Sequence, residues 1–356
     1  MKVRWGPQHP VSGQWSFFLD VDADVVVGME PDVGYTHRGI EKVAENRTYI
    51  QDVPIVERAC IFDAGNFVFG YVEAVEELMG IEVPERAKFI RVIVGEMSRI
   101  ASHLYWLCLM SIAVGLETML MWPVNDRELF LDLLEMLTGI RLTYSYFIPG
   151  GVRYDLPAGF REETERRMDY FERRLKDYYK MLYLNRTFQM RTKDVGVLKQ
   201  ADAIRMSVVG PNLRGSGVKI DVRKDEPYAA YDQIDFTVPT ESEGDTYARS
   251  LVRFHEMEQS IFIIREALKK IPSGQIRVNV SPSVPKGEVY SRVESARGEL
   301  GYYIVSDGGN KPYRLKMSAP SFRSLLSLPQ IMRGVPMADV PTLYMSLDLI
   351  PLDVDR

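Results

Sequence analysis

A helical pattern that begins at Pro84 constrains the fold of this chain more than any other stretch. Proline is favoured at the first position of a helix, and Glu82 and Glu85 would lie near the positive end of this one. Apolar side chains recur at helical spacing on a face wide enough for the inside of a helical bundle. These side chains are Phe89, Ile90, Ile93, Val94, Met97, Ile100 and Leu104. The sequence therefore predicts a long helix in a bundle core.

The most apolar run of the chain, residues 104–122, continues this helical pattern. It is about as long as a membrane span, but it contains Glu117 and extends a segment that is rich in charge. We interpret it as a buried core helix rather than as a membrane span. Contact with a membrane is then expected through partner proteins.

Other segments show the periodicity of helices and strands. Helices are predicted at residues 37–49, 65–79, 126–137, 160–192, 242–271, 321–328 and 337–344. Strands are predicted at residues 14–19, 24–29, 302–305 and 313–317, the last two forming a hairpin. Residues 208–225 hold three glycines and one proline, which favours a loop: a structural crossover, with anion binding as the less favoured alternative. The expected fold class is α+β, mainly α: a bundle of four or five long helices with small flanking β regions.

Charge and cysteine content exclude several functional classes. A net charge of −5 over 356 residues argues against a nucleic-acid-binding surface. Cys60 and Cys108 lie far apart in the sequence, so no disulfide framework is implied, and a reducing cytoplasm fits. The first ten residues show no signal-peptide pattern. The four histidines lack the spacing of zinc ligands, and no Gly-x-Ser-x-Gly nucleophile elbow is present.

Six motifs identify a family. They are GPQHP at residues 6–10, YTHRGIEK at 35–42, GIEVPERAKFIRVI at 80–93, VGPNLRGSGV at 209–218, DVRKDEPY at 221–228 and RGELGYYIVSDGG at 297–309, and the terminal residues Asp355 and Arg356 match the family as well. With these motifs the chain resembles, over nearly its whole length, the family that joins the large subunit of nickel–iron hydrogenases to the 49-kDa subunit of respiratory complex I. The resemblance implies a hydrogenase-large-subunit-like helical bundle. It also implies a small partner subunit that carries a [4Fe–4S] cluster.

The resemblance further suggests how the chain is divided. Residues 1–64 are expected to form an N-terminal β region and a loop that faces the partner's cluster. Residues 65–356 are expected to form the helical bundle with β-hairpin insertions, and the C-terminal tail is expected to return to the N-terminal loop.

The hydrogenase branch of the family holds nickel and iron with four cysteines. The resemblance places Cys60, Asp63, Ile350 and Asp353 at those four positions, so one thiol of four remains. A nickel–iron centre depends on soft thiolate ligands. The sequence therefore predicts no metal bound by this chain alone.

In the quinone-reducing branch a histidine closely follows the GPQHP motif and a tyrosine lies in the segment equivalent to residues 57–66. An aspartate supports that histidine, and a second histidine lies near the terminal cluster. The resemblance places Gly13, Ile61, Ala113 and Thr143 at these positions. Quinone reduction needs two protons, which positioned acids deliver. The joint loss of these groups weakens a quinone-reducing interpretation, although other donors could serve.

A third branch fits the sequence better. It comprises archaeal, membrane-bound sulfur reductases driven by ferredoxin, which lack both the nickel ligands and the quinone-site residues. The resemblance implies that electrons pass from the small subunit's [4Fe–4S] cluster to polysulfide or a related sulfane sulfur. It also implies membrane-arm subunits for ion translocation, reduced ferredoxin acting through other subunits, and a position at the cytoplasmic face of the cell membrane.

Two cations are candidates for setting the charge of this site. Arg58 and Arg297 occupy positions that the family places beside the cluster. Fixed cations stabilise the reduced state of a cluster and attract anionic substrates. The alternative for each arginine is a structural ion pair.

Four further residues are candidates for direct participation. Cys60 is expected either to face the substrate cavity or only to pack, as buried free cysteines commonly do. Asp63 and Asp353 are candidates for proton transfer or for pairing with the arginines, and His9 in the GPQHP motif is a weaker one.

Two alternative functions stay open. One is an archaeal or complex I-like dehydrogenase subunit that reduces a quinone or phenazine, for which a long apolar tunnel is expected. The other is a structural subunit that covers the partner's cluster and transmits conformational change to the membrane arm. A short polar pocket would favour sulfur reduction instead.

Overall fold

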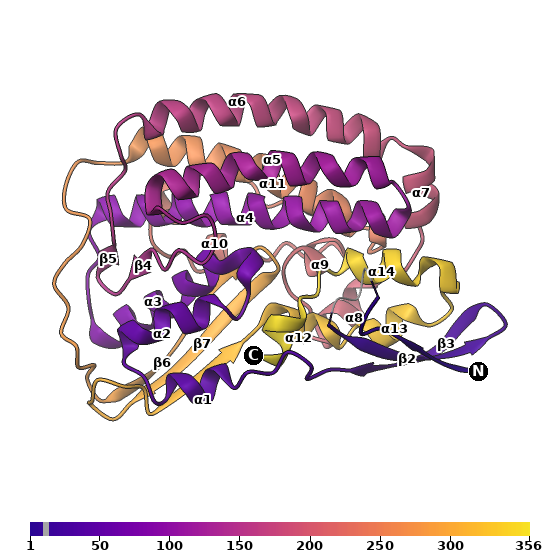
Figure 1. The fold of residues 1–356 in the computed structure, drawn as a ribbon, viewed down its shortest axis with the longest axis horizontal. Coiled ribbons are helices and arrows are strands. Elements are labelled where there is room, and N and C mark those ends of the chain that lie inside the picture. The colour runs from indigo at the N-terminus through magenta and orange to yellow at the C-terminus, as the bar shows by residue number, and fades with distance from the viewer. Residues whose placement is uncertain (10–13) are drawn as a thin grey trace.

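A bundle of long helices forms the body of the protein in this computed structural model (Figure 1). The structure describes residues 1–9 and 14–356, and within them five helices are 16 residues or longer. They are α3 (Ala64–Met79), α4 (Glu85–Val114), α5 (Glu117–Thr138), α6 (Phe160–Tyr178) and α11 (Thr246–Lys270). Helix α4 lies against α5 and α11, and α6 covers the outside of the bundle (Figure 1). The predicted mainly helical fold is confirmed.

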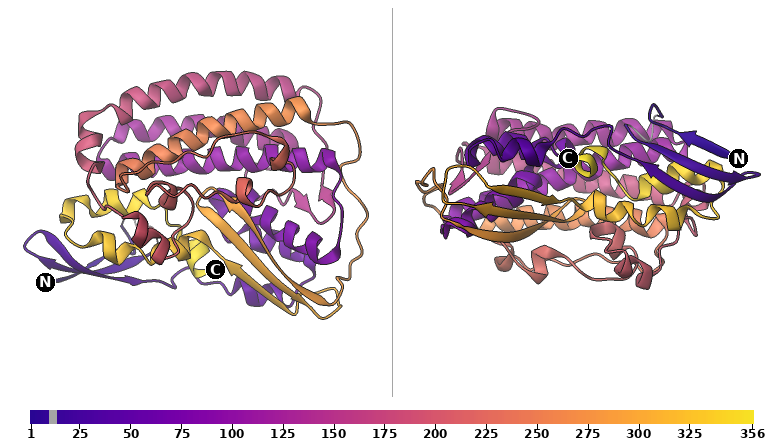
Figure 2. Two further views of the ribbon diagram at one scale, coloured as in Figure 1. Left: turned by 180° about the vertical axis from the view of Figure 1, so that it is seen from behind. Right: turned by 90° about the horizontal axis from the view of Figure 1, so that it is seen from below.

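Two antiparallel sheets flank the bundle (Figures 1 and 2). The first is formed by β1 (Lys2–Trp5), β2 (Ser16–Asp22) and β3 (Val25–Asp32). The second is formed by β6 (Gly287–Ser295), β7 (Gly298–Ser306) and β8 (Arg314–Ser318), and α3 packs on it. The predicted strands correspond to β2, β3, β7 and β8, whereas β6 was not predicted. A short ribbon of β4 (Phe147–Ile148) and β5 (Gly151–Val152) lies beside α4.

The prediction of one continuous helix through residue 122 is wrong. Helix α4 ends at Gly115, which adopts a left-handed conformation with φ 84°. The N–H groups of Gly115 and Leu116 donate to the carbonyls of Ile112 and Ser111, which is the Schellman arrangement for ending a helix. The chain then starts α5, which absorbs the separate helix predicted at 126–137. By length and composition α4 alone, within the described residues, could cross a membrane, but most of its apolar window is buried in the protein, as predicted for a core helix.

Several shorter segments also differ from prediction. Residues 208–225 are not a simple loop, because they contain the short helices α9 (Gly210–Arg214) and α10 (Val222–Asp225). The helix predicted at 160–192 is interrupted after α6 by a π-helical turn and resumes as α7 (Arg186–Thr192). The helix predicted at 37–49 is shorter in the structure, where α1 spans Ile40–Ala44 and a separate helix α2 (Tyr49–Glu57) follows. The remaining short helices are α8 (Gln200–Arg205), α12 (Pro320–Leu325), α13 (Leu328–Met332), α14 (Val340–Ser346) and α15 (Pro351–Asp355).

The C-terminal helix α15 is fastened to the segment that precedes α1. The Asp355 carboxylate accepts hydrogen bonds from the Gly34 and Thr36 N–H groups at 2.9 and 2.8 Å, and from the Thr36 hydroxyl at 2.8 Å. The His37 Nδ1 atom lies 2.6 Å from the Asp355 carbonyl oxygen. These contacts hold the tail against a part of the chain more than 300 residues away. The division at residue 64 stays a prediction.

Two glycines allow α9 to approach the turn between β6 and β7. Gly298 has φ +122°, and a Cβ atom there would lie 2.6 Å from the Gly210 nitrogen. We expect Gly298→Ala to destabilise the protein by about 3 kcal/mol or more, because backbone atoms would have to move and the left-handed conformation disfavours alanine. Chemical denaturation of the purified protein measures this loss.

Gly308→Ala is the matched control. Gly308 also has a left-handed φ, +101°, but the nearest atoms to its added Cβ lie 3.9 Å away. We expect a cost of about 1 kcal/mol from the backbone conformation alone. Equal losses for the two variants would contradict the steric explanation.

Candidate functional site

Arg297 occupies the turn between β6 and β7 and is buried. Its Nη2 and Nε atoms donate to the Oδ1 atom and the carbonyl oxygen of Asp348, both at 3.1 Å. Its Nη1 atom donates to the Ser102 hydroxyl of α4 at 3.0 Å and lies 3.7 Å from the Cys60 sulfur. Arg297 therefore joins the C-terminal tail, α4 and the loop after α2, and Asp348 neutralises its charge.

Cys60 lies between α2 and the 3₁₀ turn Ile61–Asp63, and its side chain is fully buried. Burial raises the pKa of the Cys60 thiol, and the nearby Asp353 and Asp63 carboxylates act in the same direction against Arg297. The thiol is therefore neutral at physiological pH. This environment matches the packing alternative, because a reactive cysteine needs thiolate character and exposure.

Asp63 and Asp353 are also buried, and both lie near Cys60. The Asp63 carboxylate accepts hydrogen bonds from the Asn66 amide at 2.7 Å, the Ser98 hydroxyl at 3.1 Å and the Ala296 N–H at 2.7 Å. Burial is the main cause that raises the pKa of Asp63. Asp63 therefore bridges α3, α4 and the β6–β7 turn and has little freedom to exchange protons.

Asp353 is less well satisfied than Asp63. Its Oδ2 atom accepts a hydrogen bond from the Ser321 hydroxyl at 2.9 Å, whereas its Oδ1 atom has no partner among the described residues. Burial raises the pKa of Asp353 to about 7, although Arg297 acts to lower it. A carboxyl group with a free oxygen and this pKa is suited to take up and release a proton near neutral pH.

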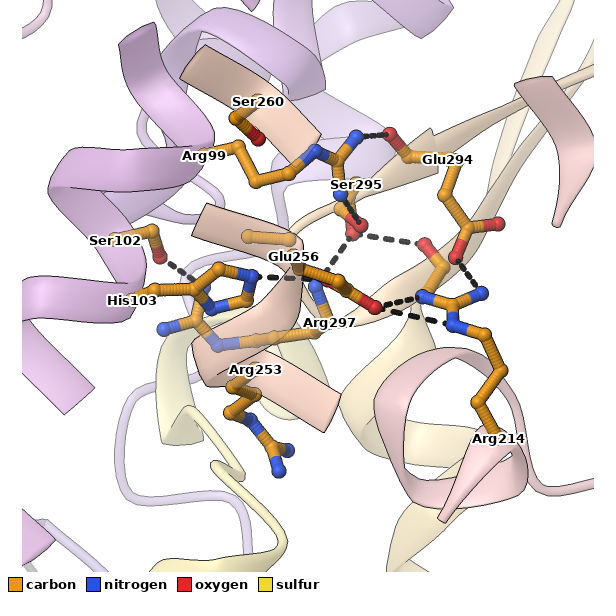
Figure 3. Close-up of polar contacts among 12 residues, drawn as sticks. Arg99, Ser102, His103, Arg214, Arg253, Glu256, Ser260, Glu294, Ser295 and Arg297 are labelled. Carbon is orange, nitrogen blue, oxygen red and sulfur yellow. Dashed lines mark hydrogen bonds and ion pairs between the residues drawn. The ribbon is translucent and has the colours of Figure 1, made fainter. Parts of the chain in front are cut away.

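A network of buried charges extends from Arg297 into the bundle (Figure 3). The His103 Nε2 atom lies 2.9 Å from the Glu256 carboxylate, and Arg214 donates to the same carboxylate at 2.6 Å. Arg214 also donates to Glu294 at 2.8 Å. Burial lowers the pKa of His103, so the imidazole is neutral.

A second part of the network surrounds Glu96 of α4. Arg99 and Arg223 pair with the Glu96 carboxylate at 3.2 and 3.0 Å, and the Ser260 and Tyr231 hydroxyls donate to it at 2.6 and 2.7 Å. Arg99 also donates to the carbonyls of residues 294 and 295 (Figure 3). The network thus fixes the strand that leads into Arg297.

Arg58 and His9 lie outside this buried group. Arg58 caps the C-terminal end of α2, is exposed to solvent and donates to the Pro54 carbonyl at 2.5 Å. The ring of His9 lies 4.3 Å from that of Trp5 at the end of β1. The structure therefore brings Cys60, Asp63, Asp353 and Arg297 together. The two arginines differ, because Arg58 is exposed and Arg297 is buried.

The positions expected to bind a quinone headgroup lie partly in one crevice. Ile61 and Thr143 line it together with Arg127 and Arg141, and its volume is about 10 Å³. This is room for about one water molecule. Ala113 lies on α4, where its carbonyl accepts a hydrogen bond from Thr342, and Gly13 lies outside the described residues.

The donor set around Cys60 does not fit a nickel–iron centre. The residues brought there are one thiol and two carboxylates, each carboxylate held by other hydrogen bonds. Soft metals of this kind need several thiolates. Among residues 1–9 and 14–356, no group of three or more histidine, cysteine, aspartate or glutamate side chains has a geometry that could hold a metal ion.

Sequence reasoning did not identify Asp348 and Ser102, which fix Arg297, or the charges around Glu96 and Glu256. One signal was available: Glu96, Arg99 and His103 recur at spacings of three and four residues on the core face of a helix. Charges on a buried face need partners. Asp348 carries no such signal, because it precedes a short apolar run in the tail.

Three comparisons with known proteins bear on this geometry. An NADH-quinone oxidoreductase subunit of Carboxydothermus hydrogenoformans is 45% identical over 358 residues, covering 100% of this chain and 98% of the relative. An F(420)H(2) dehydrogenase subunit of Methanosarcina mazei is 42% identical, with the same coverage. A chain of the structure of an archaeal membrane-bound sulfane sulfur reductase superimposes with a TM-score of 0.97 at 39% identity, covering 100% of this chain and 98% of that one.

A family model completes the assignment. The model that describes the 49 Kd subunit of respiratory-chain NADH dehydrogenase matches residues 113–283 and 277–356. These segments span more than half of the chain. Together with the relatives of more than 40% identity over its full length, they show that the chain belongs to the family of the respiratory-chain NADH dehydrogenase 49-kDa subunit.

Proposed function

We propose that this chain is the large subunit of a membrane-anchored, ferredoxin-dependent complex that reduces sulfane sulfur and couples the reaction to ion translocation. The observation that carries the proposal is the chemistry around Ile61, Thr143 and Cys60. The first two line a crevice with no acid at the expected headgroup positions, and the third is a lone neutral thiol. The fold similarity to a sulfane sulfur reductase chain supports the same proposal.

The reaction consumes two electrons and one proton. For a polysulfide it reads Sₙ²⁻ + 2e⁻ + H⁺ → Sₙ₋₁²⁻ + HS⁻: one S–S bond breaks and the proton goes to the released sulfide. A [4Fe–4S] cluster in the adjacent small subunit would supply the electrons. Asp353 is the residue of this chain best suited to hold the proton, because its pKa is about 7 and its Oδ1 atom has no partner among the described residues.

Reduction of a quinone or phenazine is the second candidate. It is favoured by the curated relatives, whose names describe NADH-quinone oxidoreductase and F(420)H(2) dehydrogenase subunits at 45% and 42% identity. The observation against it is the small volume beside Ile61, which admits about one water molecule and no aromatic ring in this chain alone.

The purified complex tests the two functions directly. With reduced ferredoxin as donor, we expect sulfide release from polysulfide and little reduction of a water-soluble quinone or phenazine analogue. Sulfide is measured colorimetrically and the other acceptors by absorbance. Robust quinone or phenazine reduction without sulfide release would overturn the proposal.

Asp353→Asn tests the protonation of the buried carboxyl. The folded-state pKa of about 7 lies above the ordinary value of 3.8, so the native protein binds this proton more tightly than the unfolded chain. The free energy of unfolding therefore falls as pH rises from about 4 to about 7, and the loss due to this carboxyl stays constant above that range. Asparagine keeps an acceptor for Ser321 but does not ionise. We expect the stability of the variant relative to the native protein to increase across this window.

Thermal unfolding at pH 5 and pH 8 measures this difference. Asp355→Asn is a control, because Asp355 lies on the same helix and is bound by several donors. A pH-independent difference for Asp353→Asn would show that the carboxyl ionises normally in the folded protein.

A further inference from the structure

The connection between α11 and β6, residues 271–286, runs along one end of the molecule, opposite the N-terminal sheet (Figures 1 and 2). Its middle part is extended and pairs with the β4–β5 ribbon. The Val152 N–H donates to the Ile276 carbonyl and the Val278 N–H donates to the Gly150 carbonyl, both at 3.0 Å. The connection therefore adds a third, outer strand to a ribbon that is otherwise very short.

The outer edge of this added strand has unpaired backbone groups. In an antiparallel pair, the N–H and C=O groups of successive residues point to opposite sides of the strand. Those of Ile276 and Val278 point to the ribbon, so those of Arg277 and Asn279 point away from it. Within residues 1–9 and 14–356 these four groups have no hydrogen-bond partner, and both residues are exposed. An unpaired strand edge is a template for another extended chain.

An apolar groove lies beside this edge. Its volume is about 410 Å³, and residues of α2, α3 and the β4–β5 turn line it together with residues 277–280. Volumes of about 300–1,000 Å³ are typical of ligand pockets. Ile50 of α2 is 51% exposed, and Met79, Ile148 and Pro149 are half-buried. The groove thus offers apolar surface to side chains that do not belong to its own walls.

The groove is fixed in shape by the contacts at the far end of the connection. The Val284 N–H donates to the Gly309 carbonyl, and the Ser306 hydroxyl donates to the Val284 carbonyl, both at 3.0 Å. These bonds attach the connection to the end of β7, while the Val278 N–H attaches it to the ribbon. A groove that is already formed binds at a lower entropic cost than one that must order first.

The charge at the groove is positive. Among the described residues that line it, Arg277 is the charged one, and its guanidinium group has no carboxylate partner within the described part of the chain. Arg47, which precedes the lining residue Thr48, is exposed and forms no ion pair there either. The exposed Asp307 lies near Tyr49, but its Oδ1 atom accepts a hydrogen bond from the Gly309 N–H. Positive charge on an interface selects an acidic partner.

We propose that an extended, acidic segment of another subunit binds here as an additional strand. Its backbone pairs with Arg277 and Asn279, its alternate apolar side chains fill the groove, and one of its carboxylates pairs with Arg277. A small apolar ligand would leave the two N–H and two C=O groups of the edge without partners. Relatives of this chain are named as subunits of larger enzymes, so further subunits are expected beside it. The proposal holds whichever electron acceptor the complex reduces.

Amide hydrogen exchange, read residue by residue, tests the added strand. We expect the Arg277 and Asn279 amides to exchange at least about tenfold more slowly in the intact complex than in the purified full chain, the effect of one backbone hydrogen bond each. The Val278 amide is the internal control, because it is bonded to Gly150 and is protected in both samples. Equal exchange of the Arg277 and Asn279 amides in the two samples would overturn the proposal.

Arg277→Lys tests the acidic character of the occupant in the intact complex. The variant keeps the positive charge and supplies an amine that a carbodiimide couples to a carboxylate in direct contact. We expect a cross-link from position 277 to an aspartate or glutamate of another subunit, located by mass spectrometry.

Lys286 is the matched control for this cross-link. It is an exposed lysine of the same connection but does not line the groove, so we expect it not to couple to the same segment. A cross-link from position 277 to a second copy of this chain, an equal cross-link from Lys286, or no cross-link from position 277 would each contradict the proposal.

Discussion

The pairing of buried arginines with carboxylates is the constraint on which the rest of the structure depends. In the part of the chain that is described, seven arginines are buried, and five of them pair with carboxylates. Glu96 pairs with two of them, and Glu256 pairs with Arg214 and contacts His103. Removing one partner of such a pair typically costs about 3–5 kcal/mol, because a buried charge is left without compensation. The bundle, the crossover at residues 208–225 and the second sheet are therefore fixed relative to one another.

This constraint separates two kinds of cation in the candidate site. Arg297 lies at the edge of the network, donates hydrogen bonds to Asp348 and Ser102, and lies 3.7 Å from the Cys60 sulfur. Its charge stabilises the fold of the tail and contributes a fixed potential. Arg58, by contrast, is exposed and donates to the Pro54 carbonyl.

The sequence predicted the long helices and the order of the β regions, because apolar periodicity follows directly from burial. The sequence did not predict the end of α4 at Gly115, because a glycine followed by further apolar residues gives the same pattern inside a helix as at its end. The hydrogen bond from the Leu116 N–H to the Ser111 carbonyl shows that the helix ends there. Residues 208–225 appeared to be a loop because short helices with little periodicity are stabilised by tertiary contacts.

Of the site, Cys60, Asp63, Asp353 and Arg297 were identified through family motifs. Asp348 depends on contacts between distant segments, which no local pattern reports.

The burial of Cys60 has a consequence for the chemical durability of the protein. A neutral thiol without solvent contact reacts slowly with alkylating agents, peroxides and disulfides, since these attack the thiolate. A cell that handles reactive sulfur would otherwise convert such a thiol into mixed disulfides. Arg297 lies 3.7 Å from this sulfur and is itself held by Asp348 of the C-terminal tail. The rate at which the thiol is modified is therefore expected to report how often this part of the structure opens locally.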